Sequence, residues 1–369
     1  MVTSLSRRFF TVLIDVCSFM VMAGALTAAP AGTAESPSGK TVVVTDVMNR
    51  RVTIRQPLDR VVTVNTASAI IIRALGADLK SKIVGVTSYI TENPEFWPGL
   101  KDRPSLEFKN LNYETLAELN PQLLILYATS PRFTQEEKLT SLGIEWLYLD
   151  CFTPATLDKE IRLLGSLFGR SDEAETLVRW YKNYDRLIQS RLQDEGGTKR
   201  PRMFYYRSPD LFLAQGIYRT INRHSSSHTV IERAGGLNLA AAVSGQGAQV
   251  SAEWIVERNP EVIVAEVQAK RFSGYSADCA TAERNMKTVR ENLINDKALK
   301  VTDAVRNNRV LLLSHDIDSG PSYVIGMACI AKFLYPDRFR DIDPDSIACE
   351  YFRTWCGLPC RGVFICPPF

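Results

Sequence analysis

Apolar and polar residues follow one another in blocks that predict a short helix and then a buried strand. The pattern is clearest over residues 251–265, SAEWIVERNPEVIVA. Ser251 can cap the helix N-terminus, and Glu253 lies in the first turn, where a carboxylate favours the positive end of the helix dipole. An Asn-Pro pair then stops the helix. The β-branched run VIV that follows is typical of a buried strand.

The same pattern occurs earlier, over residues 112–126, NYETLAELNPQLLIL. Asn112 takes the place of Ser251 as the cap, Glu114 takes the place of Glu253, and the Asn-Pro pair and the apolar strand follow without a gap. Two aligned copies predict a chain built from two similar lobes. The alternative is a common helix–strand connection that happens to occur twice, but it leaves the matching caps and first-turn glutamates unexplained.

Helices and strands alternate along the rest of the chain, which predicts parallel α/β sheets. Further strands are expected at residues 41–46, 51–54, 60–64, 82–86, 145–149, 202–206 and 309–313. Further helices are expected at residues 67–75, 134–142, 229–234, 296–304 and 320–334. Residues 269–282 contain few core-forming side chains and predict a surface loop.

One long helix is predicted between the two copies, over residues 171–193. It has an acidic start and an apolar stripe at helical spacing, formed by Leu177, Trp180, Tyr181, Tyr184, Leu187 and Ile188. At about 1.5 Å per residue this helix would be roughly 34 Å long. We interpret it as a spine that connects the lobes, and its aromatic stripe as a packing surface and not a cofactor site.

The length of 369 residues suits two domains of ordinary size. Arg7 and Arg8 precede an apolar stretch, which predicts an export signal over residues 1–34 and also resembles a twin-arginine signal. Asp15 interrupts that stretch and argues against a membrane anchor. We therefore expect a signal peptide (1–34), an N-terminal lobe (35–155), connecting helices with the spine (156–195), a C-terminal lobe (196–336) and a cysteine-rich tail (337–369).

Charge and cysteine content further narrow the classes of protein to which this chain can belong. The net charge of +3, without a long basic run, gives no reason to expect a nucleic-acid partner. Outside the signal segment there are seven cysteines, so at least one thiol is free or bonded to another molecule. Four of them lie in the tail, where one or two local disulfides are expected in an exported protein. A metal site is the alternative there, but no CxxC pair and no nearby histidine supports it.

Signals of enzyme chemistry are weak. His224 and His228 have the spacing of metal ligands on one helical turn, yet the RHSSSH segment is serine-rich and better suited to a loop. The chain has no GxSxG elbow, no phosphate-binding Walker loop, no HExxH motif and no GxGxxG motif. His315 and Asp316 follow a predicted strand, which is a site-like position, but no partner nucleophile can be named. A binding protein fits these observations better than an enzyme.

Ligands of open α/β sheets bind beyond the carboxyl ends of the strands. The loops expected at those ends carry Tyr89, Arg132, Tyr205, Tyr206, Arg207, His315 and Asp316. Aromatic and arginine side chains suit a bulky, partly apolar, anionic ligand such as a metal chelate. A packing or solvated role stays open for each of them.

Several segments together resemble the periplasmic substrate-binding proteins of ABC importers for iron–siderophore, haem and vitamin B12. The segments are TDVMNRRVTI, RVVTVN, ALGADLKSKIVGVTSY, LNYETLAELNPQLLI, ERAGGLNLA, VSAEWIVERNPEVIVA and AVRNNRVLLL, within residues 41–313. Two features depart from the family pattern: Asn49 stands where a glycine is usual in the first turn, and the tail beyond about Asp337 is not part of the common core. We expect that tail to pack on the surface.

The resemblance implies an α/β fold of class III: two Rossmann-like lobes with parallel central sheets, joined by one long helix, that close little on the ligand. It implies a periplasmic, monomeric receptor that is not an enzyme and has no cofactor. Its ligand would be an iron(III) chelate, a corrinoid or haem, and its partners an ABC permease and its ATPase. By this resemblance, Glu114 and Glu253 would dock to arginines of the permease. An exported enzyme or a metal-cofactor chaperone on the same scaffold is the alternative.

Overall fold

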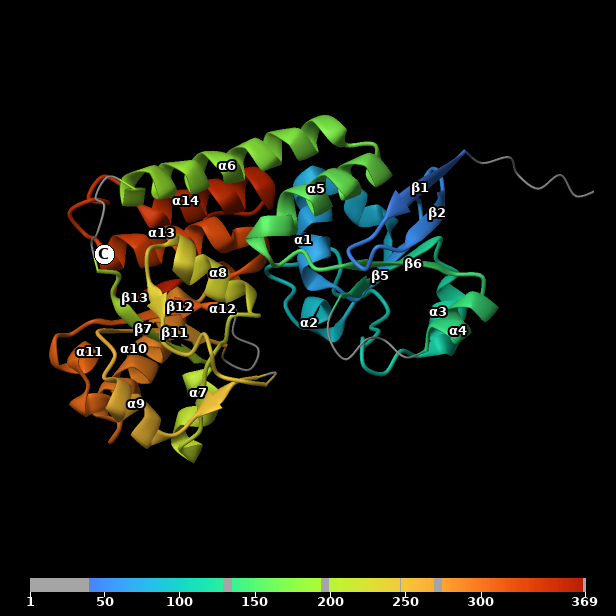
Figure 1. Ribbon diagram of the computed structural model, residues 1–369. Coiled ribbons are helices and arrows are strands. Elements are labelled where there is room, and N and C mark those ends of the chain that lie inside the picture. Colours follow the sequence, from blue (N-terminus) through green and yellow to red (C-terminus); the bar gives the residue numbers. More distant parts are fainter. Residues whose placement is uncertain (1–39, 129–134, 194–198, 246, 269–273, 368–369) are drawn as a thin grey trace, which may run out of the picture. The chain divides into compact units, whose positions relative to one another are not determined.

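The computed structural model describes residues 40–128, 135–193, 199–245, 247–268 and 274–367 (Figure 1). The predicted signal segment, residues 1–34, and Arg132 lie outside these ranges. Within them, none of the helices combines the length and the apolar character that crossing a bilayer requires.

The first lobe is built on a four-stranded sheet whose strands are all parallel. Its order is β4 (Ile83–Gly85), β3 (Val61–Thr63), β5 (Leu123–Tyr127), β6 (Glu145–Leu149). The helices along this part of the chain are α1 (Thr66–Leu75), η1 (Ala77–Lys82), α2 (Ser88–Thr91), α3 (Tyr113–Leu119) and α4 (Glu136–Ser141). These elements are preceded by an antiparallel hairpin formed by β1 (Thr41–Thr45) and β2 (Arg51–Arg55). Asn49 takes up a left-handed conformation (φ 60°) in the turn of this hairpin, a conformation that asparagine tolerates.

The second lobe is built on a five-stranded sheet. Its order is β13 (Ile365–Cys366), β12 (Val310–Ser314), β11 (Val262–Val267), β7 (Arg202–Arg207), β9 (Leu237–Asn238). All strands are parallel except β13, which pairs antiparallel with β12. The remaining elements of this part are α7 (Pro209–Phe212), η2 (Leu213–Gln215), β8 (Tyr218–Arg219), α8 (Ser226–Arg233), β10 (Gln249–Val250), α9 (Ala252–Arg258), α10 (Cys279–Asn295), η3 (Leu299–Val301), α11 (Asp303–Arg306), α12 (His315–Asp318), η4 (Gly320–Ser322) and α13 (Tyr323–Leu334).

Two helices, α5 (Pro154–Phe168) and α6 (Ser171–Gln193), run between the two sheets in the sequence and pack against each other (Figure 1). The spine predicted over residues 171–193 is confirmed as α6. Its aromatic stripe is a packing surface: Trp180 stacks on Tyr351, and Tyr181 stacks on Tyr323, with ring centroids 5.9 and 5.7 Å apart. The predicted fold class, two parallel α/β sheets joined by a long helix, is confirmed.

The repeat predicted from the sequence is visible in the backbone. Helices α3 and α9 each have seven residues, and each is capped by a side-chain oxygen, from Asn112 in α3 and from Ser251 in α9. Each ends at an asparagine in the left-handed conformation, and each leads through a proline into a buried central strand, β5 or β11. The two copies therefore share their caps, stops and strands.

One hydrophobic core continues from the first lobe into the second. It joins β2, β3 and β5 of the first lobe to β7, β11 and β12 of the second through α1, α5, α6 and α13. Two smaller cores lie elsewhere, one in each lobe. A hinge between lobes that share one core would have to open buried apolar surface, which costs roughly 25 cal/mol for each Å² exposed. The fold therefore favours two lobes held firmly together.

Two expectations about the second half of the chain are wrong. Of the surface loop expected at residues 269–282, residues 269–273 lie outside the described ranges. The described part ends early, because α10 begins at Cys279 with Asp278 as its cap and buries Ala282, Met286 and Leu293. The tail does not simply lie on the surface. It forms α14 (Pro344–Glu350), a π-helix, η5 (Tyr351–Trp355), and the strand β13.

The tail is an integral part of the shared core. Tyr351, Phe352 and Cys356 are almost fully buried. Phe352 meets Phe96 of the first lobe edge to face at 6.3 Å. The expected local disulfide is confirmed between Cys349 and Cys360. Cys356 and Cys366 are free and buried.

Candidate functional site

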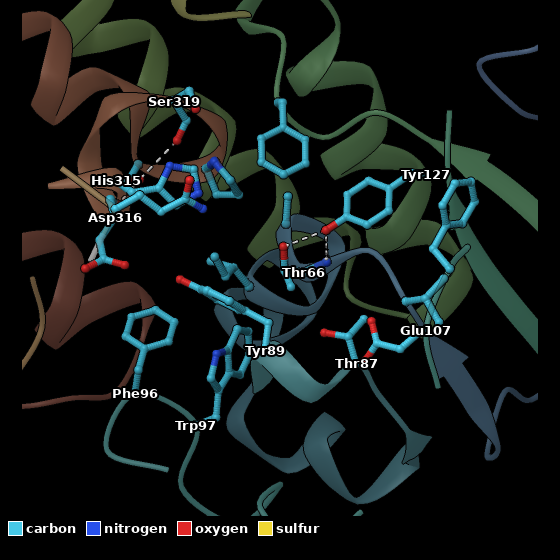
Figure 2. Close-up of a pocket in the computed structure, with 18 of the residues that line it drawn as sticks. Thr66, Thr87, Tyr89, Phe96, Trp97, Glu107, Tyr127, His315, Asp316 and Ser319 are labelled. Atoms are coloured by element: carbon cyan, nitrogen blue, oxygen red, sulfur yellow. Dashed lines mark hydrogen bonds between the residues drawn. The ribbon is translucent and has the colours of Figure 1, made fainter. Parts of the chain in front are cut away.

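The carboxyl ends of the parallel strands of both sheets surround a cleft between the two sheets. It consists of two adjoining cavities, of about 360 Å³ and about 970 Å³. Side chains that line both are Tyr127, Phe152, Arg207, His315 and Ser319, so the cavities form one continuous space. In open α/β sheets the ligand binds at this edge. Figure 2 shows the smaller cavity.

The first lobe contributes a mostly aromatic wall. Tyr127, at the end of β5, stacks on Phe152 at 6.0 Å and meets Phe108 edge to face at 5.8 Å. Its hydroxyl oxygen accepts a hydrogen bond from the backbone N–H of Thr66 (3.0 Å) and lies 2.8 Å from the hydroxyl of the same residue (Figure 2). Phe96 and Trp97 complete this wall. Rings held in this way offer a rigid apolar surface to a flat or bulky ligand.

Tyr89 projects from the short helix α2 into the smaller cavity, with 39 % of its surface exposed. Its hydroxyl points toward the side of the cavity on which His315 and Asp316 lie (Figure 2). Burial of the hydroxyl, and after it the charge of Asp316, raise the pKa of Tyr89, so the phenol stays protonated at neutral pH. It can therefore donate a hydrogen bond to a ligand.

The second lobe contributes a charged wall, from the ends of β7, β11 and β12. The Nε atom of Arg207 lies 3.4 Å from Oε2 of Glu266, and Nδ1 of His315 lies 2.6 Å from Oε1 of the same carboxylate. Nδ1 of His315 is also 3.4 Å from Oδ1 of Asp318. Glu266 and Asp318 are buried, whereas Arg207 and His315 keep part of their surface open to the cleft. On this wall the cationic side chains of Arg207 and His315 are therefore open to the cleft and paired with the buried carboxylates of Glu266 and Asp318.

The ionisation of this wall follows from its contacts. Burial alone would lower the pKa of His315, but the charges of Glu266 and Asp318 raise it well above its ordinary value, so the imidazole is protonated at neutral pH. Burial alone would raise the pKa of Asp318, but His315, a hydrogen bond from Tyr205 and the charge of Arg207 lower it. Burial raises the pKa of Asp316, whose Oδ2 accepts hydrogen bonds from Ser314 and from the backbone N–H of Tyr275.

Of the seven ligand-binding residues predicted from the sequence, the structure brings four together around the cleft: Tyr89, Arg207, His315 and Asp316. Arg132 lies outside the described residues. Tyr205 and Tyr206 are not offered to the cleft as expected, because both are fully enclosed in the central strand β7. Their hydroxyls donate to Oδ2 of Asp318 and to the carbonyl of Ile217, respectively.

Sequence reasoning missed several residues that line the cleft, chiefly Tyr127, Phe152, Trp97, Glu266 and Asp318. A signal existed for two of them. Glu266 is the one charged residue in the otherwise apolar strand VIVAEV, and Tyr127 is the last residue of a buried strand. A charged side chain inside a buried strand requires a partner or a ligand.

His224 and His228, the two histidines considered as metal ligands, lie in different structural elements. His224 lies in a loop that lines the larger cavity, whereas His228 lies in α8. The serine-rich segment is therefore only partly a loop, since α8 begins at Ser226. Nδ1 of His228 lies 3.2 Å from the amide nitrogen of Asn238, so this ring serves local packing.

Glu114 and Glu253 occupy matching, exposed positions in the first turns of α3 and α9. Hydrogen bonds from its own backbone N–H and with the Ser251 side chain lower the pKa of Glu253, so the group stays ionised. Both side chains thus lie on the surface of their lobes.

Comparison with known proteins agrees with this geometry. A family model described as periplasmic binding protein matches residues 61–316. The molybdate-binding protein MolA of Haemophilus influenzae is 25% identical over 355 residues, covering 85% of this chain and 90% of that protein. The vitamin B12-binding protein of Salmonella typhimurium is 25% identical over 210 residues, covering 57% and 73% of the two chains. The solved structure of the TroA-like periplasmic binding protein FepB from Veillonella parvula superposes with a TM-score of 0.73 at 18% identity, covering 89% of this chain and all of that one.

Proposed function

The chain belongs to the periplasmic binding protein family, and from that premise we propose that it is the extracytoplasmic receptor of an ABC importer for a metal chelate. An iron(III) chelate is the first choice, and a corrinoid or haem the next. The receptor takes up this ligand in the cleft and delivers it unchanged to a membrane permease that is driven by an ATPase. The export signal in residues 1–34 is part of the same proposal.

The observation that carries the proposal is the contrast between the two walls of one cleft. One wall is aromatic, around Tyr127 and Phe152, and the other is charged, around Arg207 and His315. A metal chelate has the matching properties, because it combines an apolar organic shell with charged metal-binding groups. Among the curated relatives, several are named as vitamin B12-binding or cobalamin-binding proteins, which supports a ligand of this class.

A small oxyanion is the second candidate, because MolA is named as a molybdate-binding protein and matches over 85% of this chain. The charges around the cleft favour it less. Acidic lining residues of the described chain are Glu107, Asp150, Glu266, Asp316 and Asp318, against the basic Arg207, Arg223 and His315. A site for a bare oxyanion needs a surplus of positive charge and N–H donors.

Ligand binding is testable by fluorescence, since Trp97 lines the smaller cavity. The protein is titrated with a ferric siderophore, cobalamin, haem and molybdate. Saturable quenching by one of the first three, with the ligand recovered unchanged, supports the proposal. Saturable binding of molybdate alone selects the second candidate. Conversion of the ligand would contradict the receptor function and favour an enzyme or chaperone.

Two variants locate the binding. Tyr89→Ala removes an exposed ring from the cavity and is expected to weaken chelate binding about tenfold, in line with roughly 1–2 kcal/mol for one aromatic contact. Leu142→Ala removes an exposed apolar side chain just after α4, outside the lining of either cavity, and is expected to change nothing. Equal affinities of the two variants would place the chelate elsewhere.

A further inference from the structure

Three metal-ligating side chains meet on the charged wall of the larger cavity. Glu266, His315 and Asp318 each offer one ligand atom, and the three atoms lie within 4.8 Å of one another. In the part of the chain that the structure describes, this is the one group of three or more such residues. All three contribute to the lining of the larger cavity, so an ion could reach them from the cleft.

The two carboxylate oxygens of Glu266 have different contacts. Oε2 faces Nε of Arg207 at 3.4 Å. Oε1 is buried and has no hydrogen-bond partner, and the same is true of Nδ1 of His315, although the two atoms are only 2.6 Å apart. The two atoms face each other as an ion pair. Oε1 thus faces only the imidazole of His315, and a metal ion bound between the two atoms would take the place of the proton on Nδ1.

The two carboxylate oxygens of Asp318 also have different contacts. Its Oδ2 accepts hydrogen bonds from the hydroxyls of Tyr205 (2.8 Å) and Ser227 (3.0 Å). Its Oδ1 lies 3.4 Å from Nδ1 of His315 and accepts from Ser319 at 3.2 Å. In metal sites, outer hydrogen bonds of this kind fix one side of a ligand and leave the other side to the ion. Here Arg207 orients Glu266, and Tyr205 orients Asp318.

The spacing of the ligand atoms suits a transition metal. Metal–ligand bonds of about 2.0–2.2 Å at tetrahedral or octahedral angles place neighbouring ligand atoms roughly 3.0–3.5 Å apart. The distances of 3.4 Å and 2.6 Å from Nδ1 require only a small outward shift of Glu266. Two carboxylates balance a charge of +2. One imidazole nitrogen with two oxygens suits Mn, Co, Ni or Zn, whereas Mg and Ca prefer oxygen alone.

We propose that Glu266, His315 and Asp318 bind one divalent transition-metal ion at the floor of the larger cavity, with its remaining coordination positions open to the cleft. The ion binds through Nδ1 of His315, Oε1 of Glu266 and Oδ1 of Asp318, and the proton on Nδ1 passes to the buffer. This site is independent of the chelate proposed above, because it rests on the side chains alone. An ion held here would itself be a ligand for an incoming small molecule.

The test is a titration of the isolated protein with Co²⁺ at constant pH, followed by visible absorption and by equilibrium dialysis. We expect one Co²⁺ per chain, with ligand-field bands of nitrogen and oxygen ligation. Intense near-ultraviolet absorption from a thiolate would instead place the ion on one of the free cysteines and overturn the proposal. Mg²⁺ in excess is expected not to displace the Co²⁺, because the site contains a nitrogen ligand.

Matched variants assign the ligands. His315→Ala and Glu266→Gln are each expected to weaken Co²⁺ binding about 100-fold, and Tyr205→Phe, which loosens Asp318, about tenfold. His228→Gln removes a histidine outside the cleft and is expected to leave Co²⁺ binding within twofold of the original chain. Unchanged binding in His315→Ala, with the thermal transition preserved, would refute the assignment.

Chelate binding is measured in parallel, which keeps the two proposals apart. A protein that binds the chelate but no Co²⁺ retains its receptor function and loses the metal site. A protein that binds Co²⁺ at these residues but none of the chelates retains the metal site, and its receptor function then concerns another solute.

Discussion

Asn120 and Asn259 end their helices with nearly the same backbone conformation, at φ 40° and ψ 60° and at φ 40° and ψ 74°. They occupy the same place in the two copies of the repeat, directly before a proline. Their side chains differ in use. The amide of Asn259 exchanges two hydrogen bonds with Asp303, at 2.8 and 2.9 Å, whereas no such side-chain bond is recorded for Asn120 among the described residues.

This difference predicts unequal responses to the same substitution. Asn120→Ala is expected to lower the free energy of unfolding by about 1–2 kcal/mol, because a Cβ-bearing residue other than Asn or Asp is strained in the left-handed region. Asn120→Gly is expected to be nearly neutral. Asn259→Gly loses the bonds with Asp303 and is expected to cost about 1–2 kcal/mol. Urea denaturation measures all three, and equal losses for both glycine variants would contradict the prediction.

Reversing the charge of the exposed glutamates of the repeat is predicted to impair transport and to leave ligand binding intact. We expect Glu114→Lys combined with Glu253→Lys to reduce coupling to the permease roughly tenfold, since two exposed ion pairs contribute about 1–2 kcal/mol together. Stimulation of ATP hydrolysis in a reconstituted transporter measures this coupling. Ligand binding in solution is expected to stay unchanged, because neither residue lines the cleft.

The chain offers a matched control for that experiment. Glu118 and Glu257 are exposed glutamates one helical turn further along the same two helices, again at equivalent positions of the repeat. Their double replacement by lysine changes the net charge by the same amount. An equal loss of coupling in both double variants would show a general charge effect and remove the docking role from Glu114 and Glu253.

Glu160 predicts an unusual dependence of stability on pH. It is buried in α5, and its carboxylate accepts hydrogen bonds from the backbone N–H groups of Asp150 (2.6 Å) and Cys151 (3.0 Å). Burial raises the pKa of Glu160 from an ordinary 4.5 to about 7. Between these values the folded chain binds more protons than the unfolded chain, so the contribution to stability is full below pH 4.5 and falls as pH rises toward 7.

The expected size of this fall is at most about 3 kcal/mol, from 1.36 kcal/mol for each unit of pKa. Unfolding free energies of the original chain and of Glu160→Gln are compared from pH 4.5 to 8, and their difference is expected to change across this window. Glu137→Gln, on the exposed surface of α4, gives the baseline. A difference that stays flat with pH would show that Glu160 ionises normally in the folded chain.

The disulfide between Cys349 and Cys360 closes a loop with a sequence separation of 11 residues around the buried π-helix. Replacing both cysteines with alanine is expected to lower the free energy of unfolding by roughly 3 kcal/mol, because the unfolded chain regains the entropy of that loop. The double variant Cys279→Ala/Cys366→Ala removes two free thiols and serves as the comparison. A loss in this second variant that equals the first would mean that packing, and not the cross-link, is measured.

The sequence predicted those parts of the fold whose cause is local. The spine helix begins and ends as expected because its acidic start and apolar stripe lie within the same 23 residues. The copies of the repeat were found because caps, Asn-Pro stops and apolar strands are all short-range signals. Helix α10 was missed because only three of its residues are buried and they are widely spaced.

Only part of the site was predicted from the sequence, and the failed predictions concern the second sheet. Tyr205 and Tyr206 are neighbours on β7, and alternation would put one of them on an open face. Both are buried because helices cover both faces of a parallel sheet, so no face is left for the cleft. Arg207, one residue later, reaches the end of the strand and lines the cleft. The roles of Glu266 and Asp318 depend on distances between strands, which one-dimensional patterns do not contain.

The placement of the tail has a consequence for the order in which the molecule can be completed. Residues 344–367 are synthesised after the parallel strands of both sheets, yet they fill the core that both lobes share, where Phe352 meets Phe96 and Tyr351 stacks on Trp180. The parallel strands of both sheets come from earlier parts of the chain, but β12 pairs only with β11 until β13 has been made. Synthesis therefore adds the last ring contacts of the shared core after the helices α1, α5, α6 and α13 that already join the two lobes.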